Sequence, residues 1–441
     1  MITFNALNDL SMEVKTYSSP YALKEAFDRN LKEWLLPFER TDVNQPFFLP
    51  DRDTFEVVDF GSGGLRLFPA EYHYPFFFRG QGQEYYPCLP SIYRHTSEGR
   101  SPDDVDIFVD RMRITEFGHL LDSHPVVNGF FRPHKFYVDY TGLAQHYGLR
   151  TDMLDITSDL DVAMFFAMCP YDKEADRYRF VDDGEEHVGI IYLLMPFFND
   201  FDPDHPFTKI SPIGLQVFDR PGRQKGFGYK MRRGESLYAR KYQFRYTSAD
   251  SAAFYQRYLD GEHLWCRDIL ADKASLIARK RSFPYSVFKQ TFREHPVKGF
   301  SKSRLKDAMK EKGIVIDHRG ASLSFSDEEK DFLVGDWYAG KSDRFRKLIT
   351  RKRWVLSRDG DGGSHAAGPW HDYRTVEMLW TEHALRLMMS ADAVCPDGCV
   401  LVGQAPEKGR RYSSGTRKVD AQFIDMKATE FLSASDMCLR P

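Results

Sequence analysis

Residues 74–82 read Tyr-Pro-Phe-Phe-Phe-Arg-Gly-Gln-Gly. The aromatic run up to Phe78 favours a short buried β-strand, and Gly80 and Gly82 end the pattern. The strand would present Arg79 at its end, beside a glycine that lets a ligand or another backbone approach closely. A guanidinium in this place suits a phosphate, which it binds through two parallel hydrogen bonds. The alternative is that Arg79 pairs with a carboxylate inside the core, because buried charges are usually paired.

A second stretch, residues 145–158, reads Gln-His-Tyr-Gly-Leu-Arg-Thr-Asp-Met-Leu-Asp-Ile-Thr-Ser and precedes an apolar run. Polar side chains gathered beside a core element are typical of a binding or catalytic site. The alternative is local capping, in which Thr157 or Ser158 caps a helix that begins at Asp159 and the carboxylate of Asp155 bonds locally. Capping leaves His146 and its neighbour Tyr147 unexplained.

Hydrophobic spacing around these stretches predicts an α+β core over residues 71–300. Helical spacing at 101–130 and 248–292 predicts helices, and the β-branched run 189–195 predicts a strand. The segment 162–168 fits either a helix or a strand. We therefore expect strands in the middle of this core, with helices on both sides.

Two further parts flank the core. Residues 1–70 are predicted to form a helical N-terminal segment, because Ser19 and Pro20 open a helical pattern. Residues 301–441 are predicted to form a mostly helical accessory lobe, which includes a helix over 341–354.

The composition bounds the kind of protein. The chain has 441 residues, a net charge of −3 and 42% hydrophobic residues, which predicts a folded chain of about two to three units. A charge near zero favours neither nucleic acid nor an anionic membrane as a global partner. The apolar runs are shorter than the roughly 18 residues that would predict a membrane span, and no signal pattern opens the chain. With six scattered cysteines, these features predict a cytoplasmic protein without membrane contact.

Two basic runs offer local charge. Between residues 219 and 245 only Asp219 and Glu235 oppose nine Lys and Arg side chains, so this run would grip a dinucleotide or a nucleic-acid backbone, or else form a solvated face. Residues 344–354 alternate basic and apolar residues, as in a basic amphipathic helix. The apolar positions of such a helix are more often core than interface.

No metal site is predicted. Cys395 and Cys399 lack a second pair of zinc ligands, and His371 and His383 lack the spacing of a helical zinc site. The loop that begins at Asp359 lacks the glutamate that a calcium loop carries at its twelfth position.

Three motifs in order resemble the bacterial FRG-domain family, which is named for the first of them. They are Phe78-Arg79-Gly80-Gln81, Gln145-His146-Tyr147-Gly148-Leu149 and Leu154-Asp155-Ile156-Thr157. Three ordered motifs are specific where any one alone would be weak. The segments at 222–227 and 261–268 resemble later parts of the same family.

The resemblance implies the layout of a mono-ADP-ribosyltransferase: a mixed, mainly antiparallel sheet flanked by helices, with NAD as the substrate and a protein or nucleic acid as the target. Arg79 would clamp the pyrophosphate, and Thr157 or Ser158 would orient the nicotinamide ribose. The implied catalytic residues are Asp155, Thr157 and Gln224. The implied NAD-binding residues are Arg79, Gly80, His146, Tyr147, Ser158 and Arg223.

The sequence departs from this pattern at Gln224, which stands where such enzymes place a glutamate, and at Lys225, which replaces a glutamine. Ribosyl transfer develops positive charge on the sugar, and a glutamine cannot offset that charge. We therefore predict slow turnover unless Asp155 points into the cleft, and we expect Arg79, His146, Asp155, Thr157 and Gln224 to converge. We also expect Arg79 and Asp155 to be partly or fully buried and satisfied by hydrogen bonds. The competing class is a non-catalytic module that senses a nucleotide or binds a protein or nucleic acid.

Overall fold

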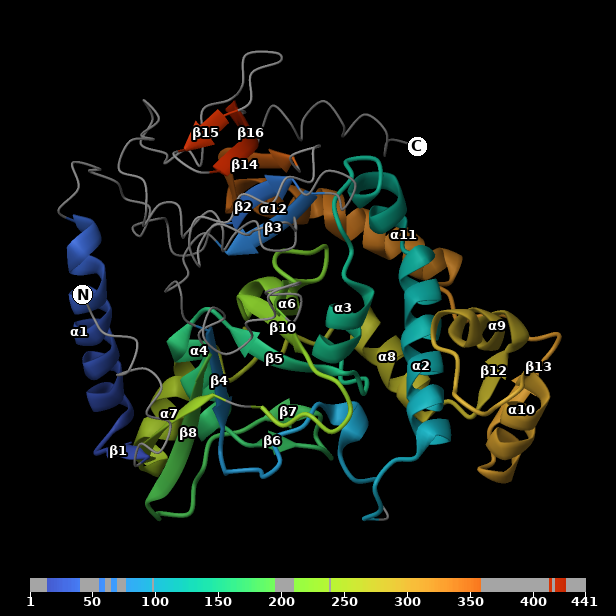
Figure 1. Ribbon diagram of the computed structural model, residues 1–441, viewed down its shortest axis with the longest axis horizontal. Helices are drawn as coiled ribbons and strands as arrows, with labels where there is room; N and C mark the ends of the chain where they lie inside the picture. Colours follow the sequence, from blue (N-terminus) through green and yellow to red (C-terminus); the bar gives the residue numbers. More distant parts are fainter. Residues whose placement is uncertain are drawn as a thin grey trace.

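The computed structural model describes residues 14–39, 55–59, 65–69, 77–96, 99–194, 210–237, 239–357, 412–414 and 417–425. At its centre lies a seven-stranded sheet with the strand order β1-β11-β8-β4-β5-β10-β9 (Figure 1). The strands are β1 (Lys15–Tyr17), β4 (Phe77–Gln81), β5 (Met153–Thr157), β8 (His187–Leu194), β9 (Ile210–Pro212), β10 (Gly226–Lys230) and β11 (Arg240–Tyr246). Only the edge pair β1 and β11 is parallel, and the other neighbours in this sheet are antiparallel. The prediction of an α+β fold with a mixed, mainly antiparallel sheet is confirmed.

The sheet opens between its two central strands. β4 pairs with β8 over five residues, and β5 pairs with β10 over five. Between β4 and β5, however, the only paired residues are Phe78 and Thr157. Beyond this pair, where Gly80 would oppose Asp155 in a continued ladder, the two strands separate. A break of this kind leaves backbone groups that other partners must satisfy.

Helices cover the sheet and extend to one side of it. Helix α4 (Leu160–Met168) packs on β4, and α1 (Pro20–Glu39) lies near the β1 edge, where the rings of Phe27 and Tyr242 of β11 are 5.0 Å apart (Figure 1). The long helix α2 (Asp104–Asp122) packs against α3 (Tyr140–His146), α8 (Ile269–Arg279) and α9 (Tyr285–Glu294). The remaining helices here are α6 (Asp219–Arg223), α7 (Ser248–Arg257), α10 (Lys302–Glu311), the single turn η4 (Ser91–Tyr93) and the π-helical turn η5 (Val127–Phe131).

The expected elements of the core are mostly present. The strand predicted at 189–195 is β8, the helix predicted within 101–130 is α2, and the segment 162–168 is helical in α4. The apolar side chains of α4 are buried on almost every position, which explains why no one-sided helical pattern was visible there.

A second sheet has the strand order β15-β16-β14-β2-β3. Its strands are β2 (Phe55–Asp59), β3 (Leu65–Pro69), β14 (Ile349–Ser357), β15 (Tyr412–Ser414) and β16 (Arg417–Asp425). The helix predicted over 341–354 is wrong beyond Leu348, because α12 (Ser342–Leu348) ends there and β14 follows. Two two-stranded sheets complete the strands: the antiparallel pair β6 (Tyr171–Asp172) and β7 (Arg177–Tyr178), and the parallel pair β12 (Ser282–Pro284) and β13 (Val315–Asp317).

The C-terminal helices share a core with the central part of the chain. Helix α11 (Asp327–Asp336) leads into the π-helical turn η6 (Trp337–Lys341), and the ring of Trp337 lies 5.0 Å from that of Phe130. Phe345 and Ile349 are buried, with Phe345 against Phe131, so these apolar positions of the 344–354 run are core, as the sequence predicts. The division into parts at residues 70 and 300 remains a prediction. In the described part of the chain, no helix is long and apolar enough to cross a membrane.

Candidate functional site

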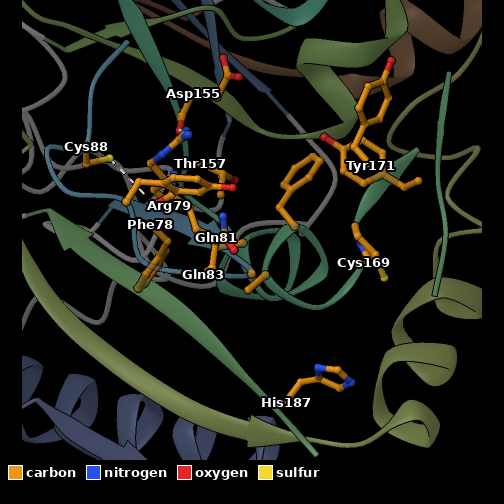
Figure 2. A pocket seen from close by; sticks show the side chains of 18 of the residues that line it. Phe78, Arg79, Gln81, Gln83, Cys88, Asp155, Thr157, Cys169, Tyr171 and His187 are labelled. Atoms are coloured by element: carbon orange, nitrogen blue, oxygen red, sulfur yellow. Dashed lines mark hydrogen bonds between the residues drawn. The ribbon is translucent and has the colours of Figure 1, made fainter. Parts of the chain in front are cut away.

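A cleft of about 1250 Å³ lies where β4 and β5 separate, and residues from all three motifs line it. Arg79 and Gly80 come from β4, and Asp155 and Thr157 come from β5. His146, at the end of α3, and Gln224, which follows α6, complete the set. Figure 2 shows Arg79, Thr157 and Asp155 close together on one side of the pocket. The predicted convergence of these residues is confirmed.

Arg79 and Asp155 bridge the opening between the two strands. The Arg79 guanidinium donates through Nη1 to the Asp155 carbonyl at 2.7 Å, in the place where a ladder hydrogen bond would otherwise lie. The Asp155 carboxylate accepts one hydrogen bond, from Gln145 Nε2 at 3.1 Å. Among the described residues, neither side chain forms an ion pair, so the reading in which Arg79 pairs with a core carboxylate is wrong.

Two polar atoms of this pair are left open. Arg79 Nε and Asp155 Oδ1 are both buried and have no hydrogen-bond partner in the described chain. Both residues are partly buried, as predicted, while the predicted satisfaction by hydrogen bonds is incomplete. Because unpaired buried polar groups are rare and costly, atoms of this kind mark places where a ligand or water completes the site.

Thr157 is held by the fold. Its hydroxyl donates to the Gln224 carbonyl at 2.8 Å and accepts from the Asp159 amide at 3.0 Å. The capping reading named the wrong residue, because the N-cap of α4 is Asp159, whose carboxylate accepts from two amides of the first turn. Ser158 is buried, its hydroxyl has no partner among the described residues, and it does not line the cleft.

Gln224 and His146 also line the cleft. The Gln224 amide donates to the Leu264 carbonyl at 2.7 Å, and this side chain is buried. Burial lowers the pKa of His146, against the opposing effect of the Asp155 carboxylate, so the imidazole is neutral. A neutral imidazole and a tethered amide orient a ligand, but neither supplies charge to it.

Tyr147 and Arg223 lie outside the cleft lining. The Tyr147 hydroxyl donates to Asp268 Oδ2 at 2.6 Å, and the Arg223 guanidinium pairs with Asp219 at 2.8 Å. The glycine motif is also structural: a Cβ on Gly80 would come within 1.7 Å of the Ala163 carbonyl oxygen, so this residue lets α4 pack directly on β4. The sequence predicts that Gly80 lets a ligand or another backbone approach closely, and the close approach of backbone is confirmed.

The basic run at 219–245 does not form one charged face. Its side chains pair with acidic partners from different parts of the chain: Arg223 with Asp219, Lys225 with Asp159, Arg233 with Asp104, Lys241 with Glu84, and Arg245 with Glu186. Most of the positive charge in this run is thereby offset locally.

Several lining residues were not anticipated from the sequence. Arg94 lines the cleft, and its pKa is lowered by burial and then by the neighbouring Arg79 guanidinium. Tyr171 and Tyr178, from β6 and β7, and Trp265 supply an aromatic wall. Of these residues, only Trp265 falls in one of the segments singled out from the sequence, at 261–268. No local pattern marks the two tyrosines, because the hairpin that presents them is very short.

The described part of the chain offers no group of side chains suited to bind a metal ion. No cluster of three or more His, Cys, Asp or Glu side chains is placed to hold an ion there. The residues weighed for zinc and calcium, at 359–399, lie outside the described ranges.

Comparison with known proteins gives one match. Residues 74–176 match the model of the FRG domain. No curated protein and no solved structure matches the chain. The matched segment contains β4, α3, β5 and α4, and with them Arg79, His146 and Asp155. The chain therefore contains an FRG domain at residues 74–176.

Proposed function

We propose that the cleft binds NAD or a related dinucleotide, and that Asp155 is the residue able to support cleavage of its nicotinamide bond. One observation carries the proposal. A carboxylate with a free buried oxygen and a guanidinium with a free buried Nε are held together in a cleft of about 1250 Å³. The proposed relation to the ADP-ribosyltransferase layout belongs to this proposal and rests on the motif resemblance.

An anion is the ligand group that best fits the arginine side of the cleft. Arg79 and Arg94 are both lining residues, and each raises the electrostatic cost of the other, which is one cause of the lowered pKa of Arg94. A pyrophosphate bound beside them would offset this repulsion and accept from the free Arg79 Nε.

The chemistry assigned to Asp155 is charge stabilisation. The bond between ribose C1′ and the nicotinamide nitrogen breaks, and its electron pair leaves with nicotinamide. Water or a target nucleophile then bonds to C1′ and releases a proton. The free Oδ1 of Asp155 would offset the positive charge that develops on the sugar, and it would hold a ribose hydroxyl.

A nucleotide sensor without turnover is the second candidate. It is favoured by the way in which Thr157 and Gln224 are tied into the fold, since the Thr157 proton and the Gln224 amide already have backbone acceptors. In that function the cleft recognises the dinucleotide and the bound state is read by another protein or nucleic acid.

The test compares wild type with Asp155→Asn, using NAD labelled in the nicotinamide ring. Asparagine keeps the size of the side chain and an acceptor for Gln145, so we expect binding to be retained and nicotinamide release to fall by about 10² to 10³. Wild type that binds NAD without releasing nicotinamide would establish the sensor. If nicotinamide is released as fast by Asp155→Asn as by wild type, Asp155 does not have the proposed role. If the protein does not bind NAD at millimolar concentration, the nucleotide proposal is wrong.

A further inference from the structure

The far side of the cleft is built from rings that the motifs do not explain. Tyr171, Tyr178 and Trp265, here called the aromatic wall, have mutual centroid distances of 5.2 to 5.5 Å. All three line the cleft. Figure 2 shows Tyr171 across the pocket from Arg79 and Asp155. The cleft therefore has a charged side and an aromatic side, as a ligand with a phosphate and a planar ring requires.

Trp265 is fixed in position by a buried arginine. The Arg220 guanidinium lies 4.1 Å from the Trp265 ring centroid and 4.6 Å from that of Tyr147, so it is sandwiched between the two rings. It also donates to the carbonyls of Cys266 at 2.8 Å and His146 at 3.2 Å. Arg220 is 2% exposed and forms no ion pair within the described residues. Contacts on this scale prevent the indole from turning and keep the ring in place for a ligand.

The indole of Trp265 has an unused donor. Its Nε1 is buried and has no acceptor in the described part of the chain. An indole N–H normally finds a partner when it is buried. A ligand ring that carries an acceptor nitrogen would supply that partner, whereas a purely hydrocarbon ring would leave it unpaired.

Charge selects which ring of a dinucleotide fits here. On the Trp265 side, Arg220 places a positive charge directly against the ring; the other charged lining residues include both signs, with Lys173 and Arg179 against Asp182 and Asp183. The oxidised nicotinamide ring is itself a cation, so this side disfavours it. A neutral purine has acceptor nitrogens and no charge, while the nicotinamide ribose is better placed near the Asp155 carboxylate.

We propose that the aromatic wall is the site for the adenine base of the dinucleotide, with Trp265 Nε1 donating to a purine ring nitrogen. This inference rests on the proposed function and adds the direction in which the ligand lies: adenine at Trp265, pyrophosphate at Arg79 and Arg94, and nicotinamide ribose at Asp155.

The experiment measures the affinities of AMP, nicotinamide mononucleotide and NAD for the full chain by titration calorimetry. The variant is Trp265→Phe, which removes the donor and part of the ring. Its matched control is Trp337→Phe, because Trp337 is a buried indole whose Nε1 also lacks a partner but which does not line this cleft. We expect AMP and NAD to bind at least about tenfold more weakly to Trp265→Phe. Nicotinamide mononucleotide should bind unchanged, and Trp337→Phe should bind all three as wild type does.

The outcomes separate this inference from the proposed function. NAD that binds wild type and Trp265→Phe equally would overturn the adenine assignment and leave the cleft as an NAD site. If Trp265→Phe instead weakens the binding of nicotinamide mononucleotide and leaves that of AMP unchanged, the adenine assignment is overturned, because the dinucleotide then lies in the opposite direction. Failure of wild type to bind any of the three would remove both proposals. If Trp265→Phe melts at a much lower temperature than wild type, Tyr171→Leu is used instead, because Tyr171 is 39% exposed. Its loss should weaken the binding of AMP in the same way.

Discussion

At the scale of single residues, the motif around Arg79 serves both packing and binding. Gly80 is required because α4 lies directly against β4, with the Ala163 carbonyl and the Ala167 amide where a side chain would begin. Backbone atoms cannot move aside as the end of a flexible side chain can. The close packing of α4 fixes the strand that carries Arg79, and so the glycine supports the site through packing.

We predict that Gly80→Ala destabilises the fold by about 3 kcal/mol or more, because the added methyl overlaps with helix backbone. Chemical denaturation measures the change. Gly82→Ala is the control: it is exposed, the nearest atom to its Cβ would be 3.4 Å away, and its effect should stay within about 0.5 kcal/mol. Equal stability of the two variants would contradict the role given to Gly80.

At the scale of elements, a chain of hydrogen bonds joins three segments behind the cleft. The Thr157 hydroxyl at the end of β5 donates to the backbone of Gln224, and the Gln224 side chain donates to the backbone of Leu264. Trp265 follows directly, so the same chain connects the strand of Asp155 to the aromatic wall. The Thr157 hydroxyl, which lines the cleft, is therefore engaged with the backbone and holds these segments in place.

We predict that Thr157→Val lowers the free energy of unfolding by about 1 to 3 kcal/mol, since the buried Gln224 carbonyl loses its donor. Ser158→Ala, one residue later, removes a buried hydroxyl that has no partner and should leave stability unchanged or raise it slightly. Thermal unfolding of both variants checks the pair. A loss as large for Ser158→Ala as for Thr157→Val would show that the hydrogen bond is not the cause.

Elements with a strong local pattern were predictable from the sequence, and contacts between distant segments were not. The strand of Arg79, the long helix α2 and the strand β8 follow from their own hydrophobic spacing. The strand β14 was mistaken for a helix because its apolar positions fit both periods and its partner β2 lies far away in the chain. The motifs located Arg79, His146 and Asp155, whereas the wall that faces them depends on Arg220 and a short hairpin that no spacing reveals.

At the scale of the whole molecule, one hydrophobic cluster links the core helices to the C-terminal helices. It includes Phe117 and Phe130 from the core and Trp337 and Phe345 from beyond residue 300. His124 is buried beside this cluster, with its ring 5.1 Å from that of Phe218 and 5.3 Å from that of Phe325. Burial, with a smaller effect of the positive Lys341, lowers the pKa of His124 to about 3. The packing that joins the two parts therefore contains His124, which is neutral in the folded protein near neutral pH.

This group should make the stability of the whole protein fall in mild acid. The pKa of His124 is about 3 in the folded protein and 6.5 ordinarily, so between these values the unfolded chain binds a proton that the folded protein does not. The stabilisation from neutral His124 is thus complete above about pH 6.5 and is lost as the pH falls, at up to about 1.4 kcal/mol per unit. His124→Asn removes the titrating group and keeps a side-chain acceptor for the Val127 amide. From pH 7.5 to pH 5, wild type should lose about 2 kcal/mol relative to this variant, measured by denaturant unfolding at each pH.

The exposed His318→Asn is the control and should follow the wild-type curve. Parallel curves for wild type and His124→Asn would mean that His124 is hydrated or protonated within the folded core, and the close packing of the C-terminal helices around it would have to be revised.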